Sequence, residues 1–332
     1  MIKYRLADLM DIRRGYFLIV LACYALSSPC LAADVLTYHN DNARTGWNPN
    51  EVVLTPSNVN ASSFGLLLNL LVDGKVDAQP LYVSNATVFG GTTSPGSHNL
   101  VIVATEHDSA YAFDADTGTL YWHASLVGPG ETPSDDRGCS QVTPEIGVTA
   151  TPVIDRDSGA NGTNGTIYVA AMSKSATAYH QRLHVLNLAT GQEVPGSPVE
   201  IQASYAGSGP HNDGNGHVIF DPGAYKERPG LLLLAGTVYT AWSSHCDHAP
   251  YTSWIIGYDE NTLEQTRVLN FDPNGAQNLS FSRTDPAMLF GTAAPGRLQT
   301  QPEIFTRSAQ MARLIRPCST GVQIREITAI PF

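Results

Sequence analysis

No apolar run in this 332-residue sequence is long enough to cross a membrane as a helix. The longest run, Gly15 to Leu26, has about 12 residues, whereas a membrane-spanning helix needs roughly 20. The small residues of Cys30-Leu-Ala-Ala33 follow this run, and four basic residues precede it: Lys3, Arg5, Arg13 and Arg14. This order predicts a signal peptide over residues 1–33. We therefore expect an exported, periplasmic or extracellular chain with no transmembrane span after signal removal.

Basic residues are scarce in the rest of the chain. Residues 34–275 contain 9 Lys and Arg against 25 Asp and Glu. A protein that binds a phosphate backbone needs clustered cations, so this composition argues against a nucleic-acid partner. Residues 276–332 differ in kind, with 6 Arg, no Lys and 3 acidic residues. The change in composition predicts a boundary near residue 275.

Common catalytic motifs are also missing. The sequence has no Gly-rich phosphate loop, no Gly-x-Ser-x-Gly, no His-Glu-x-x-His and no adjacent pair of cysteines. The densest group of metal-capable side chains is His245-Cys-Asp-His248, but all four come from one segment. A metal site needs ligands that converge from several segments, so a polar loop is the favoured interpretation. We predict neither catalytic residues nor a metal site.

The most informative stretch is Ala110 to Trp122, which reads as two strands joined by a tight turn. Asp114 can accept hydrogen bonds from turn amides, and Gly118 can adopt the positive φ that such a turn requires. Similar hairpins recur about every 72 residues, with Asn187 and Gly191 in the second copy and Asp259 in the third. A turn role explains every copy, whereas a catalytic carboxylate pair, such as Asp114 with Asp116 or Asp259 with Glu260, need occur only once.

Each hairpin follows a β-rich segment and an earlier strand introduced by proline. The β-rich segments are 99–104, 165–170 and 236–241, and the prolines are Pro80, Pro152 and Pro229. Four strands in this order make one propeller blade. We predict an all-β fold with a β-propeller of four-stranded antiparallel blades, of which about three are recognisable over residues 34–275.

The blades carry long insert loops, and the tail does not repeat the pattern. Gly128 to Pro144 separates the first two blades, and Ala206 to Lys226 separates the second and third. Inserts of this kind tend to carry function. Residues 276–332 contain no further repeat turn, so we predict an incomplete arc of blades and a divergent tail that is loosely packed or derived from a shifted reading frame. Thr37 to Trp47 is either a strand that completes a later blade or a loose N-terminal arm.

The sequence pattern of the repeat resembles that of pyrroloquinoline-quinone-like β-propellers. Ala110 to Trp122 matches the family pattern fully, whereas the second unit has Val194 near the tryptophan position and the third has Leu263 where glycine is expected. The resemblance implies a propeller fold shared by quinone-dependent alcohol dehydrogenases and by non-catalytic assembly factors of the bacterial envelope. A dehydrogenase would bind pyrroloquinoline quinone with calcium, but no residue here can be assigned to that cofactor.

Signal removal leaves three cysteines: Cys139, Cys246 and Cys318. Cys139 and Cys246 are the two cysteines of residues 34–275, and both lie in loop-like surroundings. Because export permits disulfides, we predict that these two residues pair. A Cα separation above about 7 Å would exclude the bridge.

Three hypotheses for function remain open at this point. The first is a non-catalytic binding or scaffolding module that presents its insert loops to a protein or glycan partner. The second is a periplasmic quinone-dependent oxidoreductase. The third is a fragment of a longer propeller with no independent function.

Overall fold

The computed structural model describes residues 33–51, 54–88, 96–158, 165–247, 252–275, 312–313 and 324–331. The predicted signal peptide, apart from Ala33, and most of the tail after residue 275 lie outside these ranges. In the described part, regular structure is almost entirely β, with one short 3₁₀ turn, η1 (His245–Asp247). No helix there is long and apolar enough to cross a membrane.

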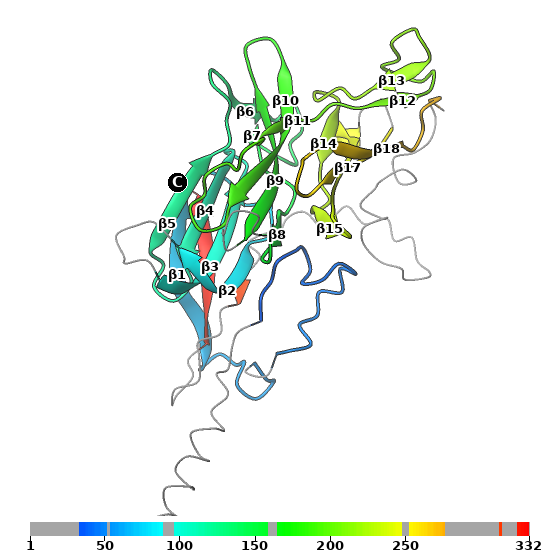
Figure 1. Ribbon diagram of the computed structural model, residues 1–332. Coiled ribbons are helices and arrows are strands. Elements are labelled where there is room, and N and C mark those ends of the chain that lie inside the picture. Colours follow the sequence, from blue (N-terminus) through cyan, green and yellow to red (C-terminus); the bar gives the residue numbers. More distant parts are fainter. Residues whose placement is uncertain are drawn as a thin grey trace, which may run out of the picture.

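Three consecutive antiparallel sheets form the body of the protein (Figure 1). The first is β2 (Leu81–Val88), β3 (Gly96–Thr105), β4 (Ser109–Asp114) and β5 (Leu120–Ser125) in sequence order. The second contains β8 (Val153–Asp155), β9 (Thr166–Lys174), β10 (Tyr179–Asn187) and β11 (Val199–Glu200). The third contains β14 (Tyr225–Glu227) and β15 (Leu232–Leu234), both paired with β16 (Thr237–Ser244), then β17 (Trp254–Asp259) and β18 (Gln265–Asn270). We call these sheets blades one, two and three.

The insert loops add short strands at one end of the molecule. β6 (Thr132–Asp135) pairs with β9 and with β7 (Glu145–Ile146), and β12 (Ser204–Ala206) pairs with β13 (His217–Ile219). Figure 1 shows these strands toward one end, while residues 33–51, in blue, lie toward the other.

Two apolar clusters hold the blades face to face. Along β9, Ile167 and Val169 pack toward blade one, whereas Tyr168 and Ala170 pack toward blade three. Side chains of a strand alternate between the two faces of its sheet, so the middle blade needs apolar residues at both parities. This is why β9 is a continuous apolar run rather than an alternating one.

The outer faces of the end blades differ. β1 (Phe64–Val72) covers blade one, where Leu70 and Val72 join a third apolar cluster with Val101 and Val103. On blade three, by contrast, Leu234 and Leu269 are 51% and 41% exposed. The prediction that the blades form an incomplete arc stays a prediction, because residues 276–311 lie outside the described ranges.

Two short segments of the tail are described. β19 (Ala312–Arg313) pairs with β20 (Ile324–Pro331), which pairs in parallel with β1. For β20 the structure therefore shows a sheet where the repeat pattern predicts loose packing. The pattern could not reveal this pairing, because β20 belongs to no repeat and meets a strand more than 250 residues earlier.

The three repeat turns have the same geometry. The amides of Gly118, Gly191 and Leu263 donate to the carbonyl groups of Asp114, Asn187 and Asp259, at 2.8, 2.8 and 3.0 Å. The side-chain oxygens of those three residues accept from amides two residues later, at 2.8–2.9 Å. All three residues at the Gly118 position have positive φ, including Leu263 at 60°.

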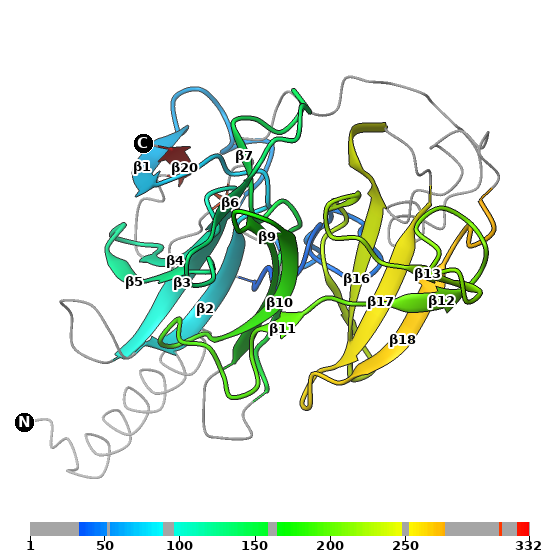
Figure 2. The ribbon, with the colours of Figure 1, turned by 90° about the horizontal axis from the view of Figure 1, so that it is seen from above.

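The N-terminal arm is neither a blade-completing strand nor loose. Val35 exchanges two backbone hydrogen bonds with Tyr82, and the carbonyl of Leu36 accepts from the amide of Ile154 at 2.8 Å. Arg44, 5% exposed, donates to the carbonyls of Gly230 and Leu231, at 3.1 and 2.8 Å. The arm thus contacts β2 of blade one, β8 of blade two and, in blade three, the segment between β14 and β15, and Figure 2 shows it in blue between β2 and β16.

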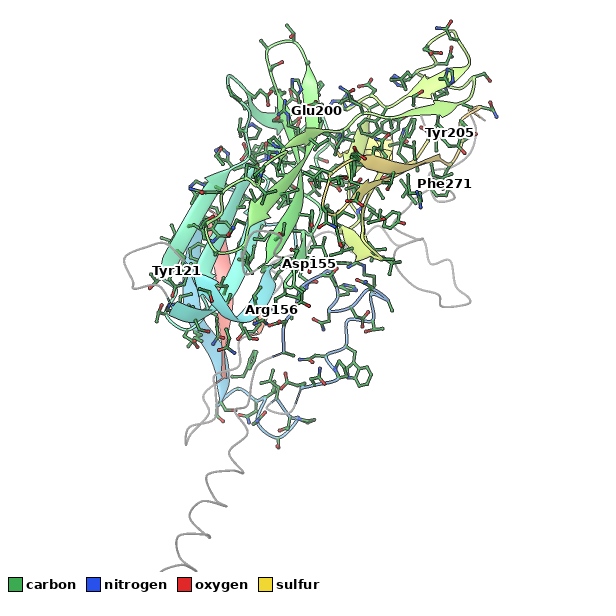
Figure 3. The ribbon with its side chains drawn as sticks, in the orientation of Figure 1. Tyr121, Asp155, Arg156, Glu200, Tyr205 and Phe271 are labelled. Carbon is green, nitrogen blue, oxygen red and sulfur yellow. A yellow bond between two sulfur atoms is a disulfide. The ribbon has the colours of Figure 1, made fainter. Side chains whose placement is uncertain are left out.

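A second anchor lies at the start of the arm. The Asp34 carboxylate pairs with Arg156, at the end of β8, and accepts from the amide of Ser84 at 2.7 Å. Arg156 also donates to the carbonyl of Ser84 at 2.5 Å. Figure 3 shows Asp155 and Arg156 beside the arm, toward the end of the molecule opposite Glu200.

Candidate functional site: a buried ionic cluster between the blades

Asp77, Thr149 and Lys226 occupy equivalent places in the three blades, each three residues before the proline that introduces the first strand. The Lys226 ammonium donates to the Thr149 hydroxyl at 2.7 Å. The Coulombic neighbours of Lys226 include both Asp77 and Glu106. Since Lys226 is only 3% exposed, a polar group of each blade is brought close to its buried ammonium.

Glu106 comes from the turn between β3 and β4 and is fully buried. Its carboxylate accepts from the Thr149 hydroxyl, at 2.8 and 2.9 Å, and from the Gly147 amide at 2.8 Å. Thr149 therefore stands between the two charged groups, accepting from Lys226 and donating to Glu106. Gly147 is needed here, because a Cβ at this position would lie 2.4 Å from the Glu106 carbonyl oxygen.

Burial dominates the ionisation of this pair. It raises the pKa of Glu106 to about 7, although the charge of Lys226 opposes the shift and a hydrogen bond with Asp77 adds to it. Burial also lowers the pKa of Lys226, against the attraction of Glu106 and Asp77. Removing a charge from water is costly, and a paired ion recovers part of that cost. The cluster is therefore most stable while Lys226 has its anionic neighbours.

Two further carboxyl groups flank the pair and are fully or almost fully buried. Asp108 is inaccessible, and neither of its carboxyl oxygens has a hydrogen-bond partner among the described residues. The same holds for Oε1 of Glu227, which is 7% exposed. Burial raises the pKa of both carboxyl groups well above the usual range, and the charge of Glu106 raises that of Asp108 further. Burial therefore favours the neutral form of both groups.

A small cavity adjoins the cluster. Lys226, Glu227, Thr149 and Gly147 line it, together with Ile146, Ala171, Met172 and Gln181. Its volume, about 10 Å³, is near the lower limit for one water molecule. An organic ligand does not fit in this space.

The residues do not fit a quinone bound with calcium. The ammonium of Lys226 already supplies a positive charge beside the carboxylates, and the cavity is too small for a multi-ring cofactor. No group of three or more His, Cys, Asp or Glu side chains in the described ranges is arranged to hold a metal ion. Tryptophans that could form a floor under such a cofactor are used elsewhere: Trp242 and Trp254 are fully buried between blades two and three.

Trp122 packs one blade on the next. Its indole donates to the Leu188 carbonyl at 3.0 Å, and a Cβ on Gly191 would lie 2.5 Å from its ring. The glycine of the second repeat therefore has two functions, a positive φ of 70° and room for the tryptophan of the preceding blade.

Cys139 and Cys246, the pair predicted from the sequence, form a disulfide with Cα atoms 5.6 Å apart. The bridge ties the first insert to the end of β16, and nearby the His245 ring lies 3.2 Å from the Asp136 carbonyl. In the second insert, His211 and His217 pair with Asp221 and Asp213 of the same insert. In the described ranges these three histidines are not grouped as ligands of one metal ion. His248 lies outside the described ranges.

The turn residues Asp114, Gly118, Asn187, Gly191 and Asp259 lie at the far ends of the hairpins and do not converge. The residues that do converge were not predicted from the sequence: Asp77, Glu106, Asp108, Lys226 and Glu227. A signal was present, because aligning the repeats on their prolines places Asp77, Thr149 and Lys226 at one position. Lys226 is also one of only three lysines after the predicted signal peptide, with Lys75 and Lys174, so a lysine at this repeat position is a distinctive feature of the sequence.

The consecutive antiparallel sheets, packed face to face in sequence order, define an all-β fold of the propeller type. No family model and no curated protein matches the chain. Among solved structures, the chain is similar to the quinohemoprotein alcohol dehydrogenase ADHIIG from Pseudomonas putida HK5, with 15% identity, TM-score 0.43, and coverage of 71% of this chain and 26% of that one. It is also similar to a europium-containing methanol dehydrogenase, with 14% identity, TM-score 0.41, and coverage of 71% and 32%.

A third similar structure is BamB from Moraxella catarrhalis, with 14% identity, TM-score 0.27, and coverage of 62% of this chain and 52% of that one. The chain thus spans about a quarter to a half of the length of these proteins. Likeness at this level does not distinguish a dehydrogenase from a protein of another function.

Proposed function

We propose that the protein is an exported, non-catalytic propeller-type module that binds a protein or glycan partner through its insert loops. The observation that carries this proposal is the filled centre of the blades. Lys226, Thr149 and Glu106 bond to one another there, and the adjoining cavity has room for about one water molecule. Because the cavity beside these described residues does not admit a substrate, we expect recognition to occur at the loops.

The first insert is held firmly against the blades, which suits a recognition surface. Glu131, at its base, accepts two hydrogen bonds from the Arg182 guanidinium, at 2.6 and 2.8 Å, and one from Ser173 at 2.6 Å. The bonds from Arg182 lower the pKa of Glu131 to about 2, so this bridge stays ionised at any physiological pH. The disulfide fixes the other side of the insert. A loop ordered before binding loses less entropy when a partner docks.

The second insert projects farthest. Residues 211–217, at the tip of the β12–β13 hairpin, are all exposed. Because β12 contacts β18 and Gln265 donates to the Gln202 carbonyl at 2.6 Å, the hairpin base is attached to blade three while the tip is free to meet a partner.

Export is supported by the signal-like N-terminus and by the disulfide, which persists in oxidising compartments. Mass spectrometry of the protein recovered outside the cytoplasm should find a mature chain that begins near Ala33 or Asp34. A chain that still begins at Met1 would contradict export by this route.

Two measurements test the proposed function. In the first, the purified protein receives pyrroloquinoline quinone and CaCl₂, and absorbance and dye-linked alcohol oxidation are recorded. We expect no change in either. Oxidation that depends on the added quinone would overturn the non-catalytic assignment.

In the second measurement, a partner captured from an extracellular or periplasmic extract is purified, and the Kd of its complex with the protein is measured directly. Replacing residues 211–217 with a Gly-Ser turn should raise the Kd at least tenfold. Trp47→Ser, a change at the opposite end where the side chain is 68% exposed, should leave it unchanged. Equal binding by all three proteins would show that the inserts are not the recognition surface.

A further inference from the structure

Lys226 is an unusual residue to find between the blades, because its ammonium is 3% exposed and has one hydrogen bond, to Thr149, among the described residues. Lysine carries a strongly hydrated point charge, so complete burial is rare unless anions balance it. The negative charges that act on Lys226 are those of Glu106, reached through the Thr149 hydroxyl, and of Asp77, which also pairs with Lys75 at 2.8 Å.

The surroundings of the ammonium are those of a cation site. The Glu106 carboxylate and the Thr149 hydroxyl supply oxygen atoms in one buried place, joined by a hydrogen bond of 2.8 Å. The Asp77 carboxylate, which is 17% exposed and pairs with Lys75 at 2.8 Å, adds a second negative charge that acts on Lys226. Such oxygen donors are the ligands that hard cations prefer. A second observation also indicates a ligand, because Glu227 lines the adjoining cavity and its buried Oε1 has no partner among the described residues.

We infer that the cluster is a cation-binding site whose cation is the chain's own Lys226 ammonium, and that without this side chain the site takes a free small cation. The alkyl stem of Lys226 carries the charge into the site, so no ion is needed from solution. The inference does not rest on the partner proposed above.

The test compares Lys226→Ala with the wild-type protein by thermal unfolding at pH 8. Leaving Glu106 buried without its counter-ion should lower the Tm by roughly 10 °C. Ethylammonium chloride, which matches the end of the lysine side chain, should restore part of the Tm in a saturable way. Ethanol at the same concentration should not, because it carries no charge. Lys174→Ala is the matched control, because the Lys174 side chain is 35% exposed in its pair with Asp135 and its loss should change the Tm little.

The same samples are then titrated with CaCl₂. The wild-type Tm should not respond to CaCl₂ or to EDTA, since its site is already filled. A rise in the Tm of the wild-type protein with CaCl₂ would show that Lys226 is not the resident cation. Absence of rescue of Lys226→Ala by ethylammonium and by CaCl₂ alike would also overturn the inference.

If Lys226→Ala does not fold, Lys226→Met keeps the stem and removes only the charge. In that background, Glu106→Gln should raise the Tm, because it removes an unpaired buried anion. In the wild-type background, the same change should lower the Tm, because it leaves the ammonium short of a counter-ion. Equal effects in both backgrounds would mean that the two groups are not coupled, which would refute the inference.

Discussion

Replacing Leu263 with glycine tests whether repeat consensus or burial decides stability at the third turn. Gly118 and Gly191 occupy the equivalent positions, and all three residues have positive φ, from 60° to 76°. A non-glycine residue in this conformation costs about 1–2 kcal/mol, so consensus reasoning expects Leu263→Gly to stabilise the protein. The structure predicts the opposite, because the Leu263 side chain is 6% exposed within the cluster between blades two and three.

The magnitude follows from two opposing terms. Deleting a buried leucine side chain costs roughly 2–5 kcal/mol, whereas relief of the backbone strain returns about 1–2 kcal/mol. Leu263→Gly should therefore lower the free energy of unfolding by roughly 1–3 kcal/mol. Leu263→Ala should lower it by the full 2–5 kcal/mol, because alanine loses the packing and keeps the strain. The expected order of stability is wild type, then glycine, then alanine.

Urea denaturation followed by tryptophan fluorescence measures this order, with midpoints compared at equal m values. Gly118→Ala serves as the control for strain alone, because a Cβ there would make ordinary contacts at 3.5 Å with Leu68 and Leu70. It should cost about 1–2 kcal/mol. If Leu263→Gly proves as stable as the wild-type protein, burial at this position contributes nothing and the packing argument is wrong.

Three other changes give equally specific results. The pKa of Glu106 is raised to about 7 in the folded state from an ordinary value of 4.5, so its contribution to stability is lost as the pH rises between those values. Relative to Glu106→Gln, the wild-type protein should lose up to about 3 kcal/mol between pH 5 and pH 8; a constant difference in urea titrations would contradict the shift. Cys139→Ser opens a loop with a sequence separation of 107 and should lower the free energy of unfolding by up to about 4 kcal/mol. If the substitution lowers it equally when both proteins are measured in reductant, the bridge is not the source of the loss. Arg44→Met leaves the carbonyls of Gly230 and Leu231 without their donor and should lower the free energy of unfolding by about 2–4 kcal/mol. Protease should then cleave the arm early. An arm as resistant to protease as in the wild-type protein would show that Arg44 does not anchor it.

The blades and their turns could be predicted from the sequence because they depend on local patterns. The turn at Asp114 needs a carboxylate and a glycine four residues apart, and the strands of the middle blade need apolar residues in succession. Cys139 and Cys246 could be paired because export leaves few alternatives. In each case the residues that determine the structure lie close together in the chain or are limited in number.

The ionic cluster and the N-terminal arm could not be predicted in this way. Glu106 and Lys226 lie 120 residues apart, and neither position has a local pattern that announces its partner. Arg44 binds backbone carbonyls, which every residue possesses, so no side-chain motif marks its target. Such contacts exist only once the blades are assembled, and their prediction requires the distances between blades rather than the order of residues.

The arm also affects the order in which the protein can fold. Its residues leave the ribosome before the blades, yet the carbonyls that Arg44 binds lie 186 and 187 positions later. The contacts of Arg44 must therefore wait until residues 230 and 231, at the start of blade three, have been synthesised and placed. Contacts of such high sequence separation slow folding, because the entropy of closing the chain is lost before the contact forms. We expect docking of the arm to be the final and slowest step. A chain stopped before residue 230 can then form its earlier blades but lacks the carbonyl groups that Arg44 binds.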